Sequence, residues 1–182
     1  MRNVSAALFI SLDGVVESPD KWQFDHFDED MMAGMGAFIA GVDTVLLGRV
    51  TYQEWAGFWP TSNLEPYASF INNTPKYVAS TTLKSVEWQN SRLINGSVAE
   101  EVRKLKQLSG KNISVQGSPT LVRSLLRDSL LDELTLMVHP VVVGSGKRLF
   151  KNGDGLKRLQ LVDSQGTRTG VAVLTYQPRR EA

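Results

Sequence analysis

Hydrophobic positions along the chain change repeatedly between strand-like runs and helical spacing, and this alternation predicts an α/β protein. Residues 4–12 are mostly branched and apolar and end at the turn pair Asp13–Gly14, which is typical of a buried strand. From Asp28 apolar residues recur at helical intervals as far as Ala40, and Gly41 is a typical helix end. Further strands are predicted at 43–48, 76–80 and 112–116, with helices at 51–55, at 67–71, after Ser97 and from Pro119.

The last third of the chain contains strand patterns only. Residues 134–143 form a long β-rich run in which Pro140 indicates a bulge or a sheet edge, and shorter strand patterns follow at 159–162 and 171–176. Early alternation of helices and strands followed by consecutive strands predicts a sheet of mixed direction, covered in a three-layer α/β/α arrangement, with antiparallel strands at its C-terminal side. A length of 182 residues suits one domain, residues 1–182.

Composition excludes several classes of function. The 20 basic and 19 acidic side chains give a net charge of +1, so no global basic field draws the chain to nucleic acid or to an anionic membrane. No apolar run approaches the length of a membrane span or resembles a signal peptide, and we therefore expect a soluble, cytoplasmic protein. With no cysteine the chain has neither disulfides nor thiolate ligands, so its chemistry must come from oxygen and nitrogen groups or from a cofactor.

Several segments resemble known functional motifs but lack residues that those motifs require. His26 and His139 are the only histidines and lack metal-ligand spacing, so we predict no metal site, and carboxylates beside His26 are those of a favourable helix start. Gly34-Met-Gly36 has no third glycine at the required position, and Gly144-Ser-Gly146-Lys147 lacks the rest of a P-loop. No Gly-x-Ser-x-Gly nucleophile elbow is present.

Two strand-to-helix turns, Gly48-Arg49-Val50-Thr51 and Gly117-Ser118-Pro119-Thr120, are stronger candidates for ligand binding. Glycine lets the backbone approach a ligand, and a helix N-terminus presents unpaired N–H groups to anions, so two such turns suit a diphosphate; each is equally compatible with a plain tight connection. Ser80-Thr81-Thr82 offers hydroxyls after another strand, and Trp55 and its aromatic neighbours suit a flat ring or ordinary core packing.

The order of these motifs resembles the dihydrofolate reductase-like superfamily and, within it, the C-terminal reductase domain of the bifunctional riboflavin-biosynthesis deaminase/reductase. The resemblance covers nearly the whole chain and rests on Ser11-Leu-Asp-Gly14, on Val45-Leu-Leu-Gly-Arg-Val-Thr-Tyr52, on Ile113-Ser-Val-Gln-Gly-Ser118, and on Leu131-Asp-Glu-Leu134 followed by Val138 to Phe150. It implies a sheet of about eight strands flanked by helices, with an NADPH site across the strand ends. It also implies a homodimer, which an apolar 134–143 strand at a free edge would favour.

The resemblance assigns roles to particular residues. The first turn, with Gly48, Arg49 and Thr51, would hold cofactor phosphate, and Ser80 and Thr81 would lie near the adenosine 2′-phosphate. The second turn, with Gly117, Ser118 and Thr120, would hold the diphosphate, while Gly144 and Ser145 would close over the nicotinamide.

For the chemistry we expect an acid on the first helix to face the substrate. Asp28, Glu29 and Asp30 are all candidates, and we favour Asp30, with Asp13 as a second catalytic candidate. Trp55 would wall the substrate pocket, and Lys147, with Lys151, would meet a substrate phosphate. The expected function is an NADPH-dependent reductase of a small heterocycle, first a phosphoribosylamino-pyrimidine, then a dihydropterin; a ligand-binding module without turnover is the alternative.

Overall fold

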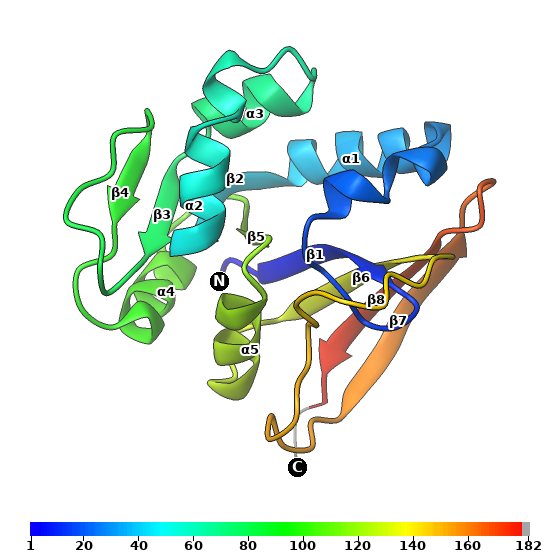
Figure 1. Cartoon of the computed structure of the whole chain (residues 1–182). Coiled ribbons are helices and arrows are strands. Elements are labelled where there is room, and N and C mark those ends of the chain that lie inside the picture. Colours follow the sequence, from blue (N-terminus) through cyan, green and yellow to red (C-terminus); the bar gives the residue numbers. More distant parts are fainter. Residues whose placement is uncertain (180–182) are drawn as a thin grey trace.

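A computed structural model describes residues 1–179, and its centre is one eight-stranded sheet in the order β4-β3-β2-β5-β1-β6-β8-β7 (Figure 1). The strands, in chain order, are β1 (Val4–Ser11), β2 (Val42–Gly48), β3 (Lys76–Ala79), β4 (Ser91–Leu93), β5 (Asn112–Gln116), β6 (Glu133–His139), β7 (Leu159–Gly166) and β8 (Ala172–Pro178). The strands from β4 to β6 in this order run parallel, whereas β8 and β7 are antiparallel to their neighbours. The predicted mixed sheet with an antiparallel C-terminal side is confirmed.

Helices cover both faces of the sheet, as the three-layer prediction requires (Figure 1). One face carries α1 (Glu29–Gly41), α2 (Arg49–Ala56) and α3 (Tyr67–Asn73), and the other carries α4 (Val98–Gln107) and α5 (Pro119–Arg127). Short 3₁₀ helices lie at Pro19–Lys21, Phe24–His26 and Trp59–Thr61. No helix in residues 1–179 has the length and apolar character that a membrane crossing needs.

The interior position of β6 corrects one premise of the sequence analysis. This strand pairs with β1 on one side and with β8 on the other, so the apolar run from Leu134 is not a free edge. It ends at His139, immediately before Pro140, because proline lacks the N–H that a further ladder bond would need. The short edge strand β4 was not predicted, since three residues carry too little alternation to be recognised.

The alternation of β1 places its side chains on two different surfaces. Ala6 and Leu8 are buried in the core that α4 and α5 cover, whereas Ala7 and Phe9 point to the opposite face and are half-buried. On that face Ala7 lies between Gln116 of β5 and Thr135 of β6. The centre of the sheet therefore presents small and polar side chains to the α1–α2 side.

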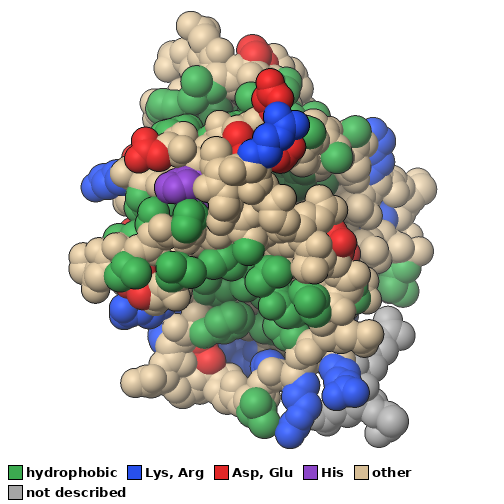
Figure 2. Space-filling model, turned by 90° about the vertical axis from the view of Figure 1, so that its right-hand side faces the viewer, with side chains coloured by type: hydrophobic (Ala, Val, Ile, Leu, Met, Phe, Trp, Pro, Cys, Tyr) green, Lys and Arg blue, Asp and Glu red, His purple; other side chains and the backbone are tan. Residues whose placement is uncertain are grey.

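Apolar side chains are also exposed on the two C-terminal strands. Leu161 and Val162 of β7 are 48% and 45% exposed, and Leu174 and Tyr176 of β8 are half-buried. Figure 2 views the molecule from this side and shows apolar side chains gathered over much of it. In Figure 1 the helices lie mainly over the parallel strands and leave much of β7 and β8 without a helix beside it.

Candidate functional site

An open groove of about 2220 Å³ lies over the small and polar floor of the sheet. Its walls come from Met31, Met35 and Phe38 of α1 and from Arg49 and Trp55 of α2. A dinucleotide and a small substrate need more room than the several hundred Å³ of a typical single-ligand pocket, and the groove provides it. The following predicted site residues line it: Asp30, Gly48, Arg49, Thr51, Trp55, Ser80, Thr81, Gly117, Ser118, Thr120 and Lys147.

The two predicted strand-to-helix turns are bonded to each other. The Ser118 hydroxyl accepts a hydrogen bond from the Gly48 amide (2.8 Å) and donates one to Thr51 Oγ1 (2.8 Å), which also accepts from the Ser118 amide (3.1 Å). A Cβ on Gly48 would lie 2.9 Å from Ser118 Oγ, and one on Gly117 would lie 3.0 Å from Thr51. Glycine at both positions is therefore required by the close approach of the turns, which sets the N-termini of α2 and α5 beside one groove.

A serine directly before Pro119 predicts an N-cap, and Ser118 does occupy the N-cap position of α5, but its hydroxyl makes no capping bond to that helix. Its backbone is in the left-handed region (φ 52°), which directs the side chain to the neighbouring turn instead. Because this partner lies 70 positions earlier in the chain, local sequence reasoning assigned the hydroxyl to the cap.

Polar side chains for a further anion surround these turns. Arg49 is exposed, donates to Gln53 Oε1 (2.8 Å) and forms no ion pair within residues 1–179. The Ser80 hydroxyl accepts from the amides of Thr82 and Leu83 (3.1 and 3.0 Å), so it organises its own turn at the groove edge. Arg49 and the Ser80 turn thus lie along the same groove, and their contact with a phosphate stays a prediction.

The acidic first turn of α1 contacts the tip of the β7–β8 hairpin. Asp28 caps the helix by accepting from Met31 N (3.0 Å) and also accepts from the amide and hydroxyl of Thr169 (3.0 and 2.9 Å). The bond from the Met31 amide, followed by those from Thr169, lowers the pKa of Asp28 from 3.8 to about 2. Glu29 pairs with Arg168 (2.8 Å). Sequence reasoning found the helix start but not this contact between segments some 140 positions apart.

Asp30 lines the groove and also meets Arg168. One carboxylate oxygen accepts from the Arg168 amide (3.1 Å), and the other lies 3.5 Å from its guanidinium. The carboxyl group is thus held at the N-terminus of α1 while its side chain remains 37% exposed. Its role as proton donor stays a prediction.

Asp13, Gly144 and Ser145 do not line the groove, although Lys147 from the same loop does. The Asp13 carboxylate accepts from the Val143 and Gly144 amides, and Lys147 pairs with Glu17 (2.9 Å) at the groove wall. Lys151, the second cation expected near a substrate phosphate, is also absent from the lining.

Sequence reasoning missed a buried polar chain at the groove floor. The Tyr67 hydroxyl donates to Gln116 Oε1 (3.1 Å), and Gln116 Nε2 donates to Ser114 Oγ (2.6 Å). Burial raises the pKa of Tyr67 far above its usual range, so its hydroxyl stays a donor. The signal was present, because Ser114 and Gln116 are polar positions on one face of β5 that alternate with the buried Ile113 and Val115. On the same floor the hydroxyls of Thr135 and Thr175 lie 3.1 Å apart.

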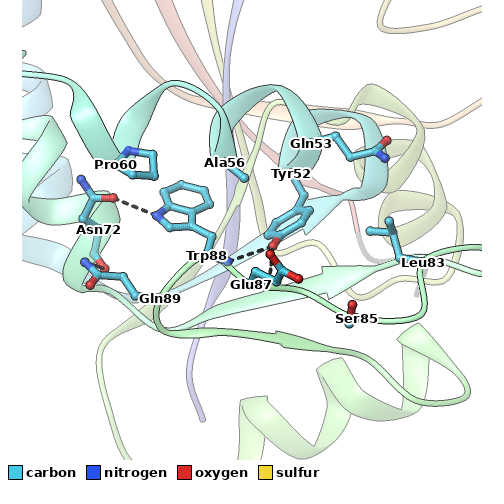
Figure 3. A pocket seen from close by; sticks show the side chains of 10 residues that line it. All are labelled: Tyr52, Gln53, Ala56, Pro60, Asn72, Leu83, Ser85, Glu87, Trp88 and Gln89. Atoms are coloured by element: carbon cyan, nitrogen blue, oxygen red, sulfur yellow. Dashed lines mark hydrogen bonds between the residues drawn. The ribbon is translucent and has the colours of Figure 1, made fainter.

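A smaller hollow of about 690 Å³ lies against α2, near α3 and the loop before β4 (Figure 3). There the Tyr52 hydroxyl accepts from the amides of Glu87 and Trp88 (2.9 and 3.1 Å), and Trp88 Nε1 donates to Asn72 Oδ1 (2.8 Å). These polar groups bond one another and tie the loop to the helices. The hollow contains none of the predicted site residues, so the larger groove is the candidate site.

Comparison with known proteins identifies the family and the fold of the chain. Residues 2–173 match the model of the RibD C-terminal domain. The chain is 32% identical to the uncharacterized protein YyaP of Bacillus subtilis, over 96% of this chain and 94% of that one. A putative riboflavin biosynthesis protein of Shewanella sp. PV-4 has a similar structure (TM-score 0.78, 20% identity, 98% and 99% of the two chains covered).

Two further solved structures share the fold. A deaminase/5-amino-6-(5-phosphoribosylamino)uracil reductase from Thermotoga maritima matches with a TM-score of 0.70 and 13% identity. The match spans 98% of this chain and 57% of the Thermotoga chain. Dihydrofolate reductase from Enterococcus faecalis, complexed with NADP(H), matches with a TM-score of 0.63 and 14% identity over 98% and 97% of the chains. The sheet, its helices and the match along residues 2–173 establish that the chain belongs to the RibD C-terminal domain family, with a dihydrofolate reductase-like fold.

Proposed function

We propose that this protein is an NADPH-dependent reductase that transfers hydride to a small heterocycle, with a 5-amino-6-(5-phosphoribosylamino)uracil as the preferred substrate. The observation that carries the proposal is the pair of interlocked turns that bring the N-termini of α2 and α5 to one groove. The names of the Thermotoga reductase and of the NADP(H)-complexed dihydrofolate reductase support the same reaction class.

The residues at the turns fit a dinucleotide phosphate. First-turn amides of a helix have no partner inside the helix and carry partial positive charge, so α2 and α5 both favour an anion at the groove. Arg49, with Ser80 and Thr81, supplies donors for the additional phosphate that distinguishes NADPH from NADH. When bound, the dihydronicotinamide supplies the hydride, and the protein contributes position and charge.

The remaining part of the groove suits a flat nitrogen-containing ring. Ala7 leaves space above the sheet, Trp55 provides an aromatic wall, and Asp30 places a carboxyl group at the N-terminus of α1. Lys147 at the wall pairs with Glu17, and a phosphate on the substrate would take over its ammonium from that carboxylate. A ribosyl phosphate uses this cation whereas a pterin does not, which ranks the pyrimidine before the dihydropterin.

Binding of NADPH is tested by titration against the tryptophan fluorescence of the protein. We expect saturable binding, tighter for NADPH than for NADH, and a loss of about tenfold in NADPH affinity for Arg49→Ala, the scale of one charge-assisted contact. Arg103→Ala, which removes an exposed arginine of α4 on the other face of the sheet, is the matched control. Equal affinity of the wild type for both nucleotides would refute the NADPH preference.

The substrate is tested by following NADPH absorbance with each candidate. We expect turnover with the phosphoribosylamino-pyrimidine and a strong reduction in Asp30→Asn. Turnover with dihydrofolate alone would reverse the ranking. Saturable NADPH binding without turnover of either compound would favour the ligand-binding module over the enzyme.

We also propose that the protein forms a homodimer through the exposed apolar side chains of β7 and β8. Burying Leu161 and Val162 against a second copy would remove apolar area from water, which favours association. Sedimentation at micromolar concentration should give twice the monomer mass of 20.1 kDa. Leu161→Glu should give monomer, whereas Leu108→Glu, at an exposed apolar position after α4, should not; a wild-type monomer contradicts the proposal.

A further inference from the structure

Two segments far apart in sequence are joined at the carboxyl end of β1. The turn after β1 and the segment after β6 share three backbone hydrogen bonds: Leu12 N to Val141 O (2.9 Å), Val16 N to Lys147 O (2.9 Å) and Leu149 N to Gly14 O (3.1 Å). These bonds fix the segment after β6 at both ends. Between them lies a loop, residues 143–147, whose last residue reaches the groove wall.

The Asp13 carboxylate holds the start of this loop. One oxygen accepts from the Ser11 hydroxyl (2.7 Å) and from the Val143 amide (3.0 Å), and the other accepts from the Gly144 amide (2.9 Å). The Arg148 guanidinium lies 3.5 Å from the second oxygen and donates to the Asp13 carbonyl (2.8 Å). The polar contacts of the Asp13 side chain are therefore directed to its own turn, to the loop and to Arg148 directly after the loop.

The other end of the loop is held by close packing and by a second carboxylate. Gly146 has φ 120°, and a Cβ there would lie 2.9 Å from Val15 Cγ1, so only glycine fits where the loop meets the turn after β1. Glu17 accepts from the Lys147 amide (3.2 Å) and pairs with its ammonium (2.9 Å). Lys147 is in this way fixed at the groove wall by contacts with the same turn.

The protonation state of Asp13 separates two possible roles. The hydrogen bond from Ser11, followed by that from the Val143 amide, lowers the pKa of Asp13 from 3.8 to about 2. A carboxylate that stays ionised near neutral pH has no proton to give to a substrate. The side chain also lies outside the groove lining, so it reaches a ligand only through the loop.

We propose that Asp13 is a positioning residue, not the catalytic acid expected from the sequence: it holds the 143–147 loop so that Lys147 meets the anionic part of the ligand. This inference rests on the proposed function for the identity of that ligand. The loop contacts themselves are independent of any ligand, and the experiment uses this difference.

The first measurement is hydrogen exchange of the unliganded protein. In Asp13→Asn an amide donor replaces one carboxylate oxygen, so Val143 and Gly144 cannot both keep their acceptors, and exchange at these amides should become at least about tenfold faster. Asp25→Asn is the control, because Asp25 is an exposed carboxylate in the same N-terminal region with no hydrogen bond or ion pair in the described chain. Asp13→Glu keeps the charge and should restore part of the protection. Unchanged exchange in Asp13→Asn would overturn the proposal.

The second measurement is steady-state kinetics with NADPH and the pyrimidine. A positioning role predicts that Asp13→Asn raises the KM for the pyrimidine about tenfold. The variant should keep kcat within about threefold of the wild type and leave the pH profile of kcat unchanged. The double variant Asp13→Asn/Lys147→Met should be no worse than Lys147→Met alone, since both changes remove the same contact. The proposal would be overturned if the effects of the two single variants on KM added up in the double variant. It would also be overturned if Asp13→Asn removed the acidic or the basic limb of the pH profile of kcat.

The two measurements fail in different ways. If the wild type binds no NADPH, the proposed function is wrong, and exchange at Val143 and Gly144 still decides whether Asp13 holds the loop. If the wild type is active and exchange is unaffected by Asp13→Asn, the proposed function stands and the positioning role is wrong.

Discussion

The two faces of β1 differ in how they are covered. On the α4–α5 side, Ala6 and Leu8 are surrounded by core side chains. On the opposite side, Ala7 and Phe9 keep part of their surface exposed in the groove. The two faces have the same backbone and register, so the difference comes from what covers them. Side chains from β1, β5, β6, α4 and α5 close the first face, while α1 and α2 leave the second open. One strand thus provides stability with its even positions and space for a ligand with its odd ones.

The largest effect should come from the covered face. Leu8→Ala removes a buried side chain and leaves a cavity, which should lower the free energy of unfolding by about 3 kcal/mol. Urea denaturation measures this loss. NADPH affinity of the folded fraction should stay within about twofold, and a large change in affinity would contradict the separation of the two faces.

A polar bond at the groove should also affect stability. Ser118→Ala removes the acceptor of the Gly48 amide and the partner of Thr51, which should cost about 2 kcal/mol because a partly buried donor is left without its bond. Thermal and urea unfolding test this. Ser124→Ala, which removes a hydroxyl bonded only to its own helix, is the control and should cost less. No loss for Ser118→Ala would mean that the turns are held by other contacts.

The open face should respond in binding rather than in stability. Ala7→Leu adds bulk to the groove floor, so the substrate KM should rise about tenfold while the free energy of unfolding changes by less than about 1 kcal/mol. Parallel kinetics and denaturation curves compare the two quantities. A stability loss as large as that of Leu8→Ala would show that the floor is packed like the core.

The smallest effect concerns the contact between α1 and the hairpin. The folded-state pKa of Asp28 lies below its ordinary value of 3.8, so its ionised form stabilises the fold above about pH 4, and this contribution disappears as the pH falls toward 2. The difference in Tm between wild type and Asp28→Asn should therefore narrow over that interval. Glu29→Gln removes only an exposed ion pair, so its Tm should stay almost equal to that of the wild type at every pH. If the Tm difference between wild type and Asp28→Asn did not change with pH, the ionised Asp28 carboxylate would not be the source of the stabilisation.

The sequence predicted those parts of the fold that depend on neighbouring residues. The apolar periodicity of α1, its acidic start and the glycine turns before α2 and α5 are local signals, and the structure has these elements where they were predicted. The bond of Ser118 to Gly48 and the contact of Asp28 with Thr169 depend on how distant segments meet, which no local pattern encodes. For the same reason the sequence could not show that the Asp13 carboxylate bonds the Val143 and Gly144 amides, a contact that appears only in the folded chain.

The central position of β1 also determines the order in which the sheet can be completed during translation. Val4 pairs with Ile113, and Ser5 pairs with Glu133, so both neighbours of the first strand are synthesised 109 and 128 positions after it. A nascent chain that ends before β5 has its most apolar strand without either partner, with both hydrogen-bonding edges unsatisfied. The groove floor is formed only when β5 and β6 have left the ribosome and inserted on either side of β1, a closure over long loops that makes folding of this topology slow.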